Sequence, residues 1–310
     1  MARAIVVRLV QAVPALVGVT LVVFLLLHAS GDPAKVLLPQ GASPAEQEAF
    51  RAAYGLDQPL AVQYGRFLLN AARGDLGTSF AYHEPTLSVL LRRLPATVDL
   101  ALAAVVLAAV VALPAGILAA LHRNSPLDQA VMLASALGQS VASFWLGLML
   151  ILLFAVQWGL LPASGTGSPA HLVLPAFTLS TFLIALLARL VRSAMLEVLG
   201  RDYLRTARAK GLSERAVVLR HALRNALIPV VTVVGVSLSN LMGGAVITET
   251  VFAWPGIGTL MYDSVIRRDY PMVLTVVFFV AVVFVVVNLL VDLLYTVIDP
   301  RIRLGGEGGT

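Results

Sequence analysis

The sequence predicts an all-α polytopic membrane protein that crosses the bilayer six times. Of its 310 residues, 59% are hydrophobic and only 13% are charged, whereas an average soluble domain is about 25% charged. Six apolar runs are each long enough to cross the roughly 30 Å hydrocarbon core of a bilayer. Most of the charged residues gather in two segments, 30–97 and 189–225. These observations together favour a membrane-spanning helical bundle over any soluble fold.

The first apolar run extends from about Leu9 to His28 and follows Arg3 and Arg8. A cleaved signal peptide also begins with positive charge, but its apolar region is usually about 7–15 residues long. The longer run favours a retained transmembrane helix, which we place at residues 1–29.

Residues 30–97 are predicted to form a small helical insertion. Unlike the apolar run before it, this segment contains Gly, Pro and equal numbers of basic and acidic residues. Ser43 is placed to cap a helix that has Pro44 in its first turn and Glu46 at the capping-box position. Gly55 can end this helix, and Gly74 can end a second one.

The remaining residues, 98–310, predict a five-helix core. Its apolar runs lie near residues 98–121, 130–156, 172–191, 228–250 and 272–297. Pro114 and Pro175 are expected to bend their helices, and AWPGIG at 253–258 predicts a sharp re-entrant turn before the last helix.

Six helices put both termini on one side of the membrane. Lys and Arg concentrate in the short segments that this topology joins to the termini, so the positive-inside rule places the termini in the cytoplasm. The insertion at 30–97 is then extracytoplasmic.

The segment 189–225 carries nine Lys or Arg residues and three acidic residues. Each basic residue at the bilayer centre costs roughly 2.5–3.5 kcal/mol, so most of this segment lies outside the membrane. Gly211 predicts a break between two short amphipathic helices. One apolar face is predicted in the second helix, formed by Ala216, Leu219, Leu223 and Leu227. Such helices either contact lipid head groups or form a docking surface for a cytoplasmic partner.

The stretch DYLRTARAKGLSERAVVLRHALRNALIPVVT, residues 202–232, resembles the EAA loop of ABC-importer permeases, in the dipeptide, oligopeptide and nickel branch. The general EAA pattern is matched at Ala207, Gly211 and Leu223 only. Further stretches resemble the same branch in order and spacing: GDLGTSF, LPAT, SFWLGLMLILLFA, LPASG, FAWPGIGTLMYDSVIRRDYPMV and NLLVDLLYTVIDPRIRLG.

The resemblance implies that residues 192–227 form cytoplasmic coupling helices, which sit in a cleft of an ATPase subunit and switch the pore when two ATPases close. The coupling residues it implies are Arg205, Thr206, Ala207, Arg208, Lys210, Gly211, Arg220, His221 and Arg224. The implied partners are a second homologous permease, two ABC ATPase subunits, an extracytoplasmic substrate-binding protein and the lipid bilayer of a prokaryotic plasma (inner) membrane, without nucleic acid. The implied cargo is short peptides, with nickel chelates, glutathione and opines as alternatives.

The sequence predicts no catalytic site or cofactor in this chain. Both lysines, Lys35 and Lys210, follow alanine, so a P-loop is absent and the partner subunits must bind and hydrolyse ATP with Mg. His83 and Glu84 begin like a zinc-protease motif, but Leu87 stands where its second histidine would be. An embedded hydrolase is therefore disfavoured. A passive channel is the other alternative, and it would not need ATP.

Polar residues within predicted spans are candidates for the transport pathway or its gate. Asp99 and Glu249 are expected near extracytoplasmic helix ends, where an interfacial or ion-paired role competes with substrate contact. Asn240 and Trp254 complete the candidate set, and Asp292 is expected to pair with a basic residue. A further pattern of small residues, four apart, permits close helix packing within the subunit or across the pore: Gly235, Ser239 and Gly243.

Overall fold

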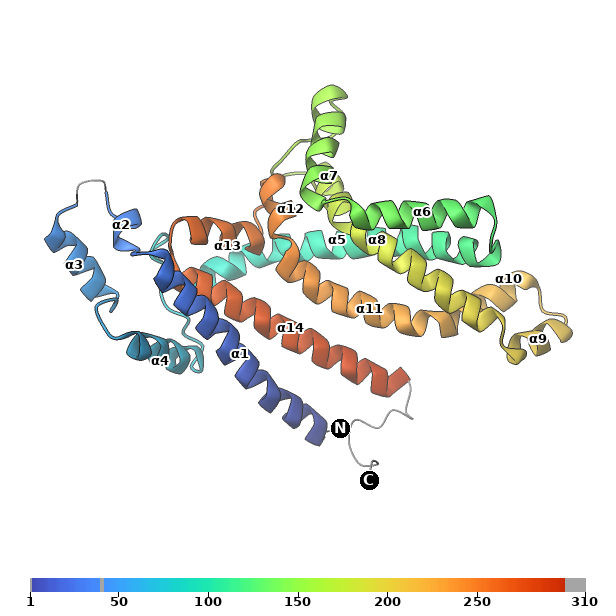
Figure 1. The fold of residues 1–310 in the computed structure, drawn as a ribbon, viewed down its shortest axis with the longest axis horizontal. Coiled ribbons are helices and arrows are strands. Elements are labelled where there is room, and N and C mark those ends of the chain that lie inside the picture. The colour runs from blue at the N-terminus through green and yellow to red at the C-terminus, as the bar shows by residue number, and fades with distance from the viewer. Residues whose placement is uncertain (1, 40–41, 299–310) are drawn as a thin grey trace. The chain divides into compact units, whose positions relative to one another are not determined.

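The computed structural model describes residues 2–39 and 42–298, and within these ranges the regular structure is helical (Figure 1). The all-α prediction is confirmed. Five helices are long and apolar enough to cross a membrane, and a sixth span is reached if one sharply bent helix pair counts as a single crossing.

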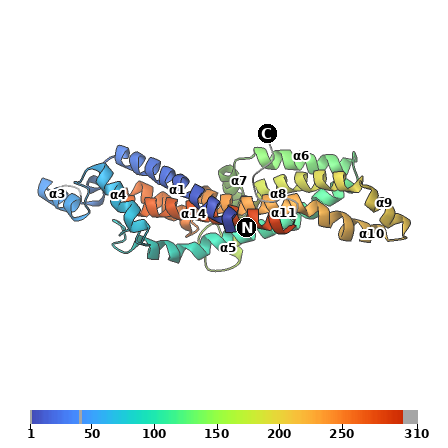
Figure 2. The same cartoon turned by 90° about the horizontal axis from the view of Figure 1, so that it is seen from below.

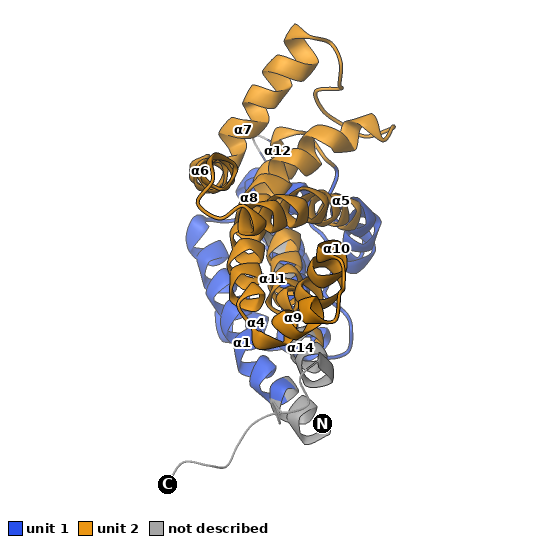
Figure 3. Cartoon of the chain, turned by 90° about the vertical axis from the view of Figure 1, so that its right-hand side faces the viewer, with its two compact units in different colours: residues 1–97, 255–289, 304–310 blue, residues 98–254, 290–303 orange. Residues whose placement is uncertain are grey.

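The described chain folds as two compact units, which Figure 3 distinguishes by colour. The first unit contains the chain up to residue 97 together with 255–289. The second contains residues 98–254 and the last part of the final helix.

The first unit combines long apolar helices with the small helices of the insertion. Its helices are α1 (Ala2–Ser30), α2 (Ala34–Leu37), α3 (Pro44–Ala53), α4 (Leu60–Ala71), the start of α5 (Thr86–Leu121), α13 (Ile257–Ile266) and most of α14 (Tyr270–Ile298). Helices α1 and α14 run side by side (Figures 1 and 2). Phe24 and Leu27 of α1 pack with Tyr270, Val273 and Leu274 of α14.

Local sequence signals predict the helices of the insertion well. The Ser43 hydroxyl accepts a hydrogen bond from the Glu46 N–H at 3.3 Å, and the Glu46 carboxylate accepts one from the Ser43 N–H at 2.7 Å. The predicted capping box of α3 is therefore confirmed. Gly55 and Gly74 follow α3 and α4 with φ of +66° and +82°, a backbone conformation that glycine adopts without steric cost.

A buried carboxylate fixes the loop before α5 to the turn between α13 and α14. Asp269 has no exposed surface. It accepts hydrogen bonds from the N–H groups of Phe80 and Ala81 at 3.0 and 3.1 Å, and from the Ser79 hydroxyl. These bonds satisfy a charge that would otherwise be costly to bury.

The second unit is organised around α8. Its helices are the rest of α5, α6 (Pro126–Ser140), α7 (Ser143–Leu150), the π-helix η1 (Ile151–Gln157), α8 (Ala170–Leu199), α9 (Asp202–Ala209), α10 (Glu214–Ala216), the π-helix η2 (Val217–Ala222), α11 (Leu223–Gly244) and α12 (Val246–Val251). Helix α8 packs against α6, α7 and α11. Its core residues include Leu187, Val191 and Met195.

Two helices differ from the runs that hydropathy predicts. The run near 130–156 is two helices, α6 and α7 with η1, bent by 101°. The break lies at Val141 and Ala142, which have extended backbones, and neither residue is a proline or a glycine. The run near 98–121 is part of α5, which begins at Thr86, because hydropathy detects only its continuously apolar portion.

Some predicted features lie outside the described residues or side chains. The side chains of Asp292 and Ser239 are among them, as are the contacts of Gly243.

Candidate functional site

After α8, the basic segment continues as α9 (Asp202–Ala209), whose amphipathic pattern fixes its orientation. Leu204 is fully buried and Ala207 is 8% exposed, and both pack into the core of the second unit with Met195 and Val217. Residues three apart lie on the same helix face, so the polar side chains between them are turned outward. The outward side chains among the predicted coupling residues are Arg205, Thr206 and Arg208.

Gly211 ends the first arm of the basic segment, which is α9, as predicted. Its φ is +79°, and its N–H donates to the Arg208 carbonyl at 2.9 Å. No atom lies within 4 Å of where a Cβ would stand. The backbone conformation, rather than lack of space, therefore requires glycine at this position.

The second arm is continuous with a long helix, unlike the separate short helix that we expected. The Ser213 hydroxyl accepts a hydrogen bond from the Ala216 N–H at 3.4 Å, which starts α10. Helices α10, η2 and α11 then follow one another without a connecting loop. After α8, the basic segment thus consists of the short helix α9, a turn at Gly211, and the first turns of the continuous helix formed by α10, η2 and α11.

The structure corrects the predicted apolar face at Leu219, whereas Leu223 and Leu227 pack against the core as expected. Val217, Val218, Ala222 and Ala226 are buried, whereas Leu219 is 59% exposed. In η2 the Leu223 N–H donates to the Val218 carbonyl, five residues back. A wider turn shifts the following side chains around the helix axis relative to α-helical spacing, so a pattern based on that spacing misplaces Leu219.

Two side-chain contacts clamp the arms together. Arg208 donates to both carboxylate oxygens of Glu214, at 3.1 and 2.7 Å, across the glycine turn. Asn225 of α11 donates to the Tyr203 hydroxyl of α9 at 2.7 Å. The hydrogen bond from Glu214 raises the pKa of the Arg208 guanidinium above its ordinary value.

The clamped loop presents an exposed basic surface. The exposed cations among the predicted coupling residues, apart from the clamped Arg208, are Arg205, Lys210, Arg220 and Arg224, and His221 is half-buried. Arg205 lies 3.6 Å from the exposed Asp202, a pair that contributes little in water. This surface can dock onto acidic groups or backbone carbonyls. Anionic lipid head groups would satisfy the same charges.

The structure does not gather the four pathway candidates into one place. Asn240 lines a cavity of about 250 Å³ between α6, α7, α8 and α11, together with Ser237 and Thr181. The other three candidates do not line it. Asp99 is exposed on α5.

Glu249 and Trp254 lie together in the interior of the second unit. The Trp254 N–H donates to the Glu249 carbonyl at 2.8 Å, and Trp254 is 6% exposed. We expected Glu249 to reach water, but its side chain has no exposed surface in the described chain.

Sequence reasoning missed an ion pair between α6 and α8. Arg192 donates to both oxygens of Asp128, at 2.5 and 2.7 Å. Asp128 lies in the first turn of α6, after the Ser125 cap, and the neighbouring residues are enough to predict this position. Its partner Arg192 is 64 residues away in the sequence, so the pair itself could not be predicted. Arg192 is therefore part of α8 packing rather than of a free loop.

No group of three or more His, Asp or Glu side chains is placed to hold a metal ion within the described ranges.

Two family models match this chain. The model described as "Binding-protein-dependent transport system inner membrane component" matches residues 112–304, and its N-terminal companion matches residues 1–101. The dipeptide transport system permease proteins DppB of Alkalihalophilus pseudofirmus and of Escherichia coli K12 are each 40% identical to it over 96% of its length, and over 98% and 97% of theirs. A putative peptide transport system permease protein of Brucella abortus is 44% identical, over 96% of this chain and 97% of its own length.

Two solved structures share the fold. The inward-facing MetNI methionine ABC transporter matches with a TM-score of 0.57 and 21% identity, over 69% of this chain and 97% of that chain. An amino acid ABC transporter solved with histidines matches with a TM-score of 0.51 and 15% identity, over 70% of this chain and 95% of that chain.

Proposed function

We propose, from the premise that this chain belongs to the family of binding-protein-dependent transport system inner membrane components, that it is a permease subunit of an ATP-driven importer of short peptides. Short peptides are proposed as the cargo because the chain is 40–44% identical to peptide permeases along nearly its whole length. The permease is a transport component without its own catalysis and belongs to the inner membrane.

The assembly around this subunit is part of the proposal. We assign it a second homologous permease, two ATPase subunits that bind and hydrolyse ATP with Mg, and an extracytoplasmic binding protein that delivers the peptide. The two permeases would enclose the pathway, with Asp99, Asn240, Glu249 and Trp254 as candidates for its wall or gate. Asn240 has the most direct support, because its amide side chain lines a cavity together with the hydroxyl-bearing Ser237 and Thr181.

We assign the ATPase contact to the basic loop. Its exposed cations lie on two arms that the Arg208–Glu214 and Asn225–Tyr203 contacts hold together. Its second arm continues into α11. A partner that moves this loop would therefore move α11 with it. The residues proposed for the contact are Arg205, Thr206, Ala207, Arg208, Lys210, Gly211, Arg220, His221 and Arg224.

The topology in this proposal has both termini in the cytoplasm and residues 30–97 outside. The chain has no cysteine, so single cysteines can report on each side. Glu48→Cys on α3 should react with an impermeant maleimide in intact cells, and Arg123→Cys, between α5 and α6, should react only after permeabilisation. Both positions are exposed. The opposite labelling pattern would invert the topology.

The function is tested on the purified complex with its binding protein, reconstituted in proteoliposomes. A dipeptide or tripeptide should stimulate ATP hydrolysis and accumulate inside in an ATP-dependent manner. Stimulation by nickel chelates, glutathione or opines, and by no peptide, would reject peptides as the cargo. Accumulation without ATP would indicate a passive channel.

The coupling role is tested at Gly211. Gly211→Val should leave the complex assembled but separate ATP hydrolysis from uptake, because valine disfavours a φ of +79°. Gly159→Val is the matched control: Gly159 has φ +60° and open space around it, but it lies outside the loop. Equal loss of uptake in both variants would show that backbone strain alone causes the loss, and it would contradict the coupling role of Gly211.

A further inference from the structure

A cavity of about 450 Å³ lies entirely within the first unit. It is bounded by α1, the end of α3, α4, the loop at 75–80 and the first turn of α14. Its volume falls in the range of about 300–1,000 Å³ that is typical of small-molecule sites. None of the four pathway candidates lines it, so it is separate from the features assigned above.

Helix α4 presents a polar face to this cavity. Gln63, Arg66, Phe67 and Asn70 all line it, and their spacing of i, i+3, i+4 and i+7 places them on one side of the helix. A face that served only for packing would be apolar. Arg66 and Asn70 are exposed and can hydrogen-bond a polar ligand, whereas the Gln63 amide bonds within the wall.

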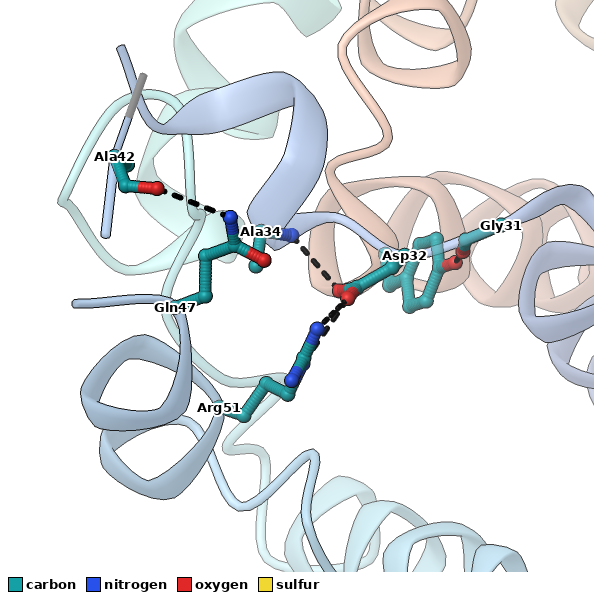
Figure 4. Close-up of polar contacts among 7 residues, drawn as sticks. Gly31, Asp32, Ala34, Ala42, Gln47 and Arg51 are labelled. Atoms are coloured by element: carbon teal, nitrogen blue, oxygen red, sulfur yellow. Dashed lines mark hydrogen bonds and ion pairs between the residues drawn. The ribbon is translucent and has the colours of Figure 1, made fainter. Parts of the chain in front are cut away.

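Two opposite charges line the cavity without pairing with each other. Among the described residues, Arg66 makes no ion pair or side-chain hydrogen bond, and Asp75 accepts one hydrogen bond, from the Gly77 N–H at 2.9 Å. The neighbouring pair in the same unit is different, as Figure 4 shows: Arg51 is directed at Asp32 and bonds it, and Asp32 also accepts from the Ala34 N–H at 3.0 Å. Arg66 and Asp75 therefore keep their capacity to bind charged groups.

Aromatic rings form the rest of the wall. Tyr54 and Phe80 have ring centroids 4.6 Å apart, and Phe24 and His28 have theirs 4.2 Å apart. Such rings accommodate varied apolar side chains, and their faces attract an ammonium group.

Hydrogen bonds hold one part of this wall in place before any ligand arrives. The His28 Nε2 and Gln63 Oε1 atoms are 3.1 Å apart. The Gln63 amide donates to the Gln58 carbonyl at 2.7 Å and to the Leu56 carbonyl at 3.2 Å. A wall fixed in this way loses little conformational freedom on binding.

We propose that this cavity binds a short peptide, with Arg66 receiving the terminal carboxylate and Asp75 the terminal ammonium. A peptide carries both charges, side chains for the aromatic wall, and amide groups that Asn70 can hydrogen-bond. A zwitterionic phospholipid head group shares the two charges but has no amide. The inference rests on the proposed function, and it adds a peptide site on this subunit that operates without the binding protein.

The test measures equilibrium binding of radiolabelled Ala-Phe to the complete permease–ATPase complex in nanodiscs, without the binding protein. Arg66→Gln and Asp75→Asn should each weaken binding at least tenfold while basal ATP hydrolysis changes less than twofold. Arg73→Gln, an exposed cation that does not line the cavity, should leave binding unchanged. Gel filtration of each variant excludes loss of assembly as the cause.

Modified peptides assign each end. N-acetyl-Ala-Phe should bind the parent protein and Asp75→Asn equally, because it lacks the ammonium group. Ala-Phe-amide should bind the parent protein and Arg66→Gln equally, because it lacks the carboxylate. If both variants respond to both peptides as they do to Ala-Phe, the assignment of the ends is wrong.

Three results overturn the proposal. They are absence of Ala-Phe binding, an equal effect of Arg73→Gln, or variants that change retention of phosphatidylethanolamine in the nanodisc but not peptide binding. The last result would make the cavity a lipid site. If peptides still stimulate ATP hydrolysis once the binding protein is added, the proposed function stands while this inference falls. If no peptide stimulates it, the function itself is wrong.

Discussion

Gly116 allows α5 and α8 to approach within backbone contact, and replacing it should loosen the second unit. A Cβ at this position would lie 2.7 Å from the Ala188 carbonyl oxygen and 2.7 Å from the Cβ of Val191. Carbon contacts are favourable at about 3.5–4.0 Å. One of the two atoms is backbone, so a side-chain rotation cannot relieve the clash, and α5 and α8 must separate.

The expected magnitude follows from two opposing terms. Alanine improves on glycine inside a helix by about 1 kcal/mol, and overpacking costs about 1–3 kcal/mol. Gly116→Ala should therefore change the free energy of unfolding by between zero and about 2 kcal/mol of destabilisation. Gly65→Ala on α4 has no atom within 4 Å of its new Cβ, so it gains the helix term alone. The difference between the two variants isolates the overpacking cost.

Thermal unfolding of the detergent-purified protein, followed by circular dichroism, measures this difference because it reports on helices of both units. Gly138→Ala supplies an intermediate point, since its Cβ would lie 3.3 Å from the Cβ of Ala185. The expected order of melting temperature is Gly65→Ala highest, Gly138→Ala next and Gly116→Ala lowest. If Gly116→Ala melts at or above Gly65→Ala, then the close approach of α5 and α8 is not present in the folded protein.

Three further outcomes are expected. Asp128→Arg and Arg192→Asp should each lower the melting temperature by breaking the bidentate pair between α6 and α8, and the double exchange should recover part of the loss; a double variant no better than the worse single one would contradict this. Arg208→Ala should speed backbone hydrogen exchange in α9 by opening the clamp to Glu214, whereas Lys210→Ala should not; equal exchange in both would remove the clamp from the account. Burial raises the pKa of Asp32, but hydrogen bonds from Arg51 and Ala34 outweigh it and hold the pKa below its usual 3.8. The contact therefore stabilises the fold at pH values above 3.8. This stabilisation is lost as the pH falls through the lower pKa of the folded state. Asp32→Asn should accordingly increase protease cleavage between α2 and α3 at pH 7, and the difference from the parent protein should shrink in acid; a difference that persists unchanged at low pH would rule out this charge.

Features specified by neighbouring residues could be predicted from the sequence. The capping box at Ser43 and Glu46 involves residues three apart, and the turn at Gly211 depends on one backbone angle. Composition predicted the apolar helices because spanning length and hydropathy are properties of single segments.

Features specified by tertiary contacts could not be predicted. The pairing of Asp128 with Arg192 joins residues far apart in the chain, and the buried position of Glu249 depends on the packing around α12. Two local features were also missed. The bend at Val141 and Ala142 has no helix-breaking residue, and the π-turn that exposes Leu219 has no compositional mark.

Because the second arm is continuous with α11, the two must move together. The helix from Glu214 to Met242 runs for 29 residues, or about 44 Å at 1.5 Å per residue. If a partner displaced the Glu214 end, as the proposed coupling role requires, the displacement would reach the far end as tilt or rotation of this helix. Two positions along it can yield: the π-turn of η2, and Pro229, which has no N–H for a helical hydrogen bond. If the π-turn released its extra residue, everything beyond it would rotate by about 100°. Under the proposed coupling role, the displacement at the tip and the rotation at the far end could thus be set independently.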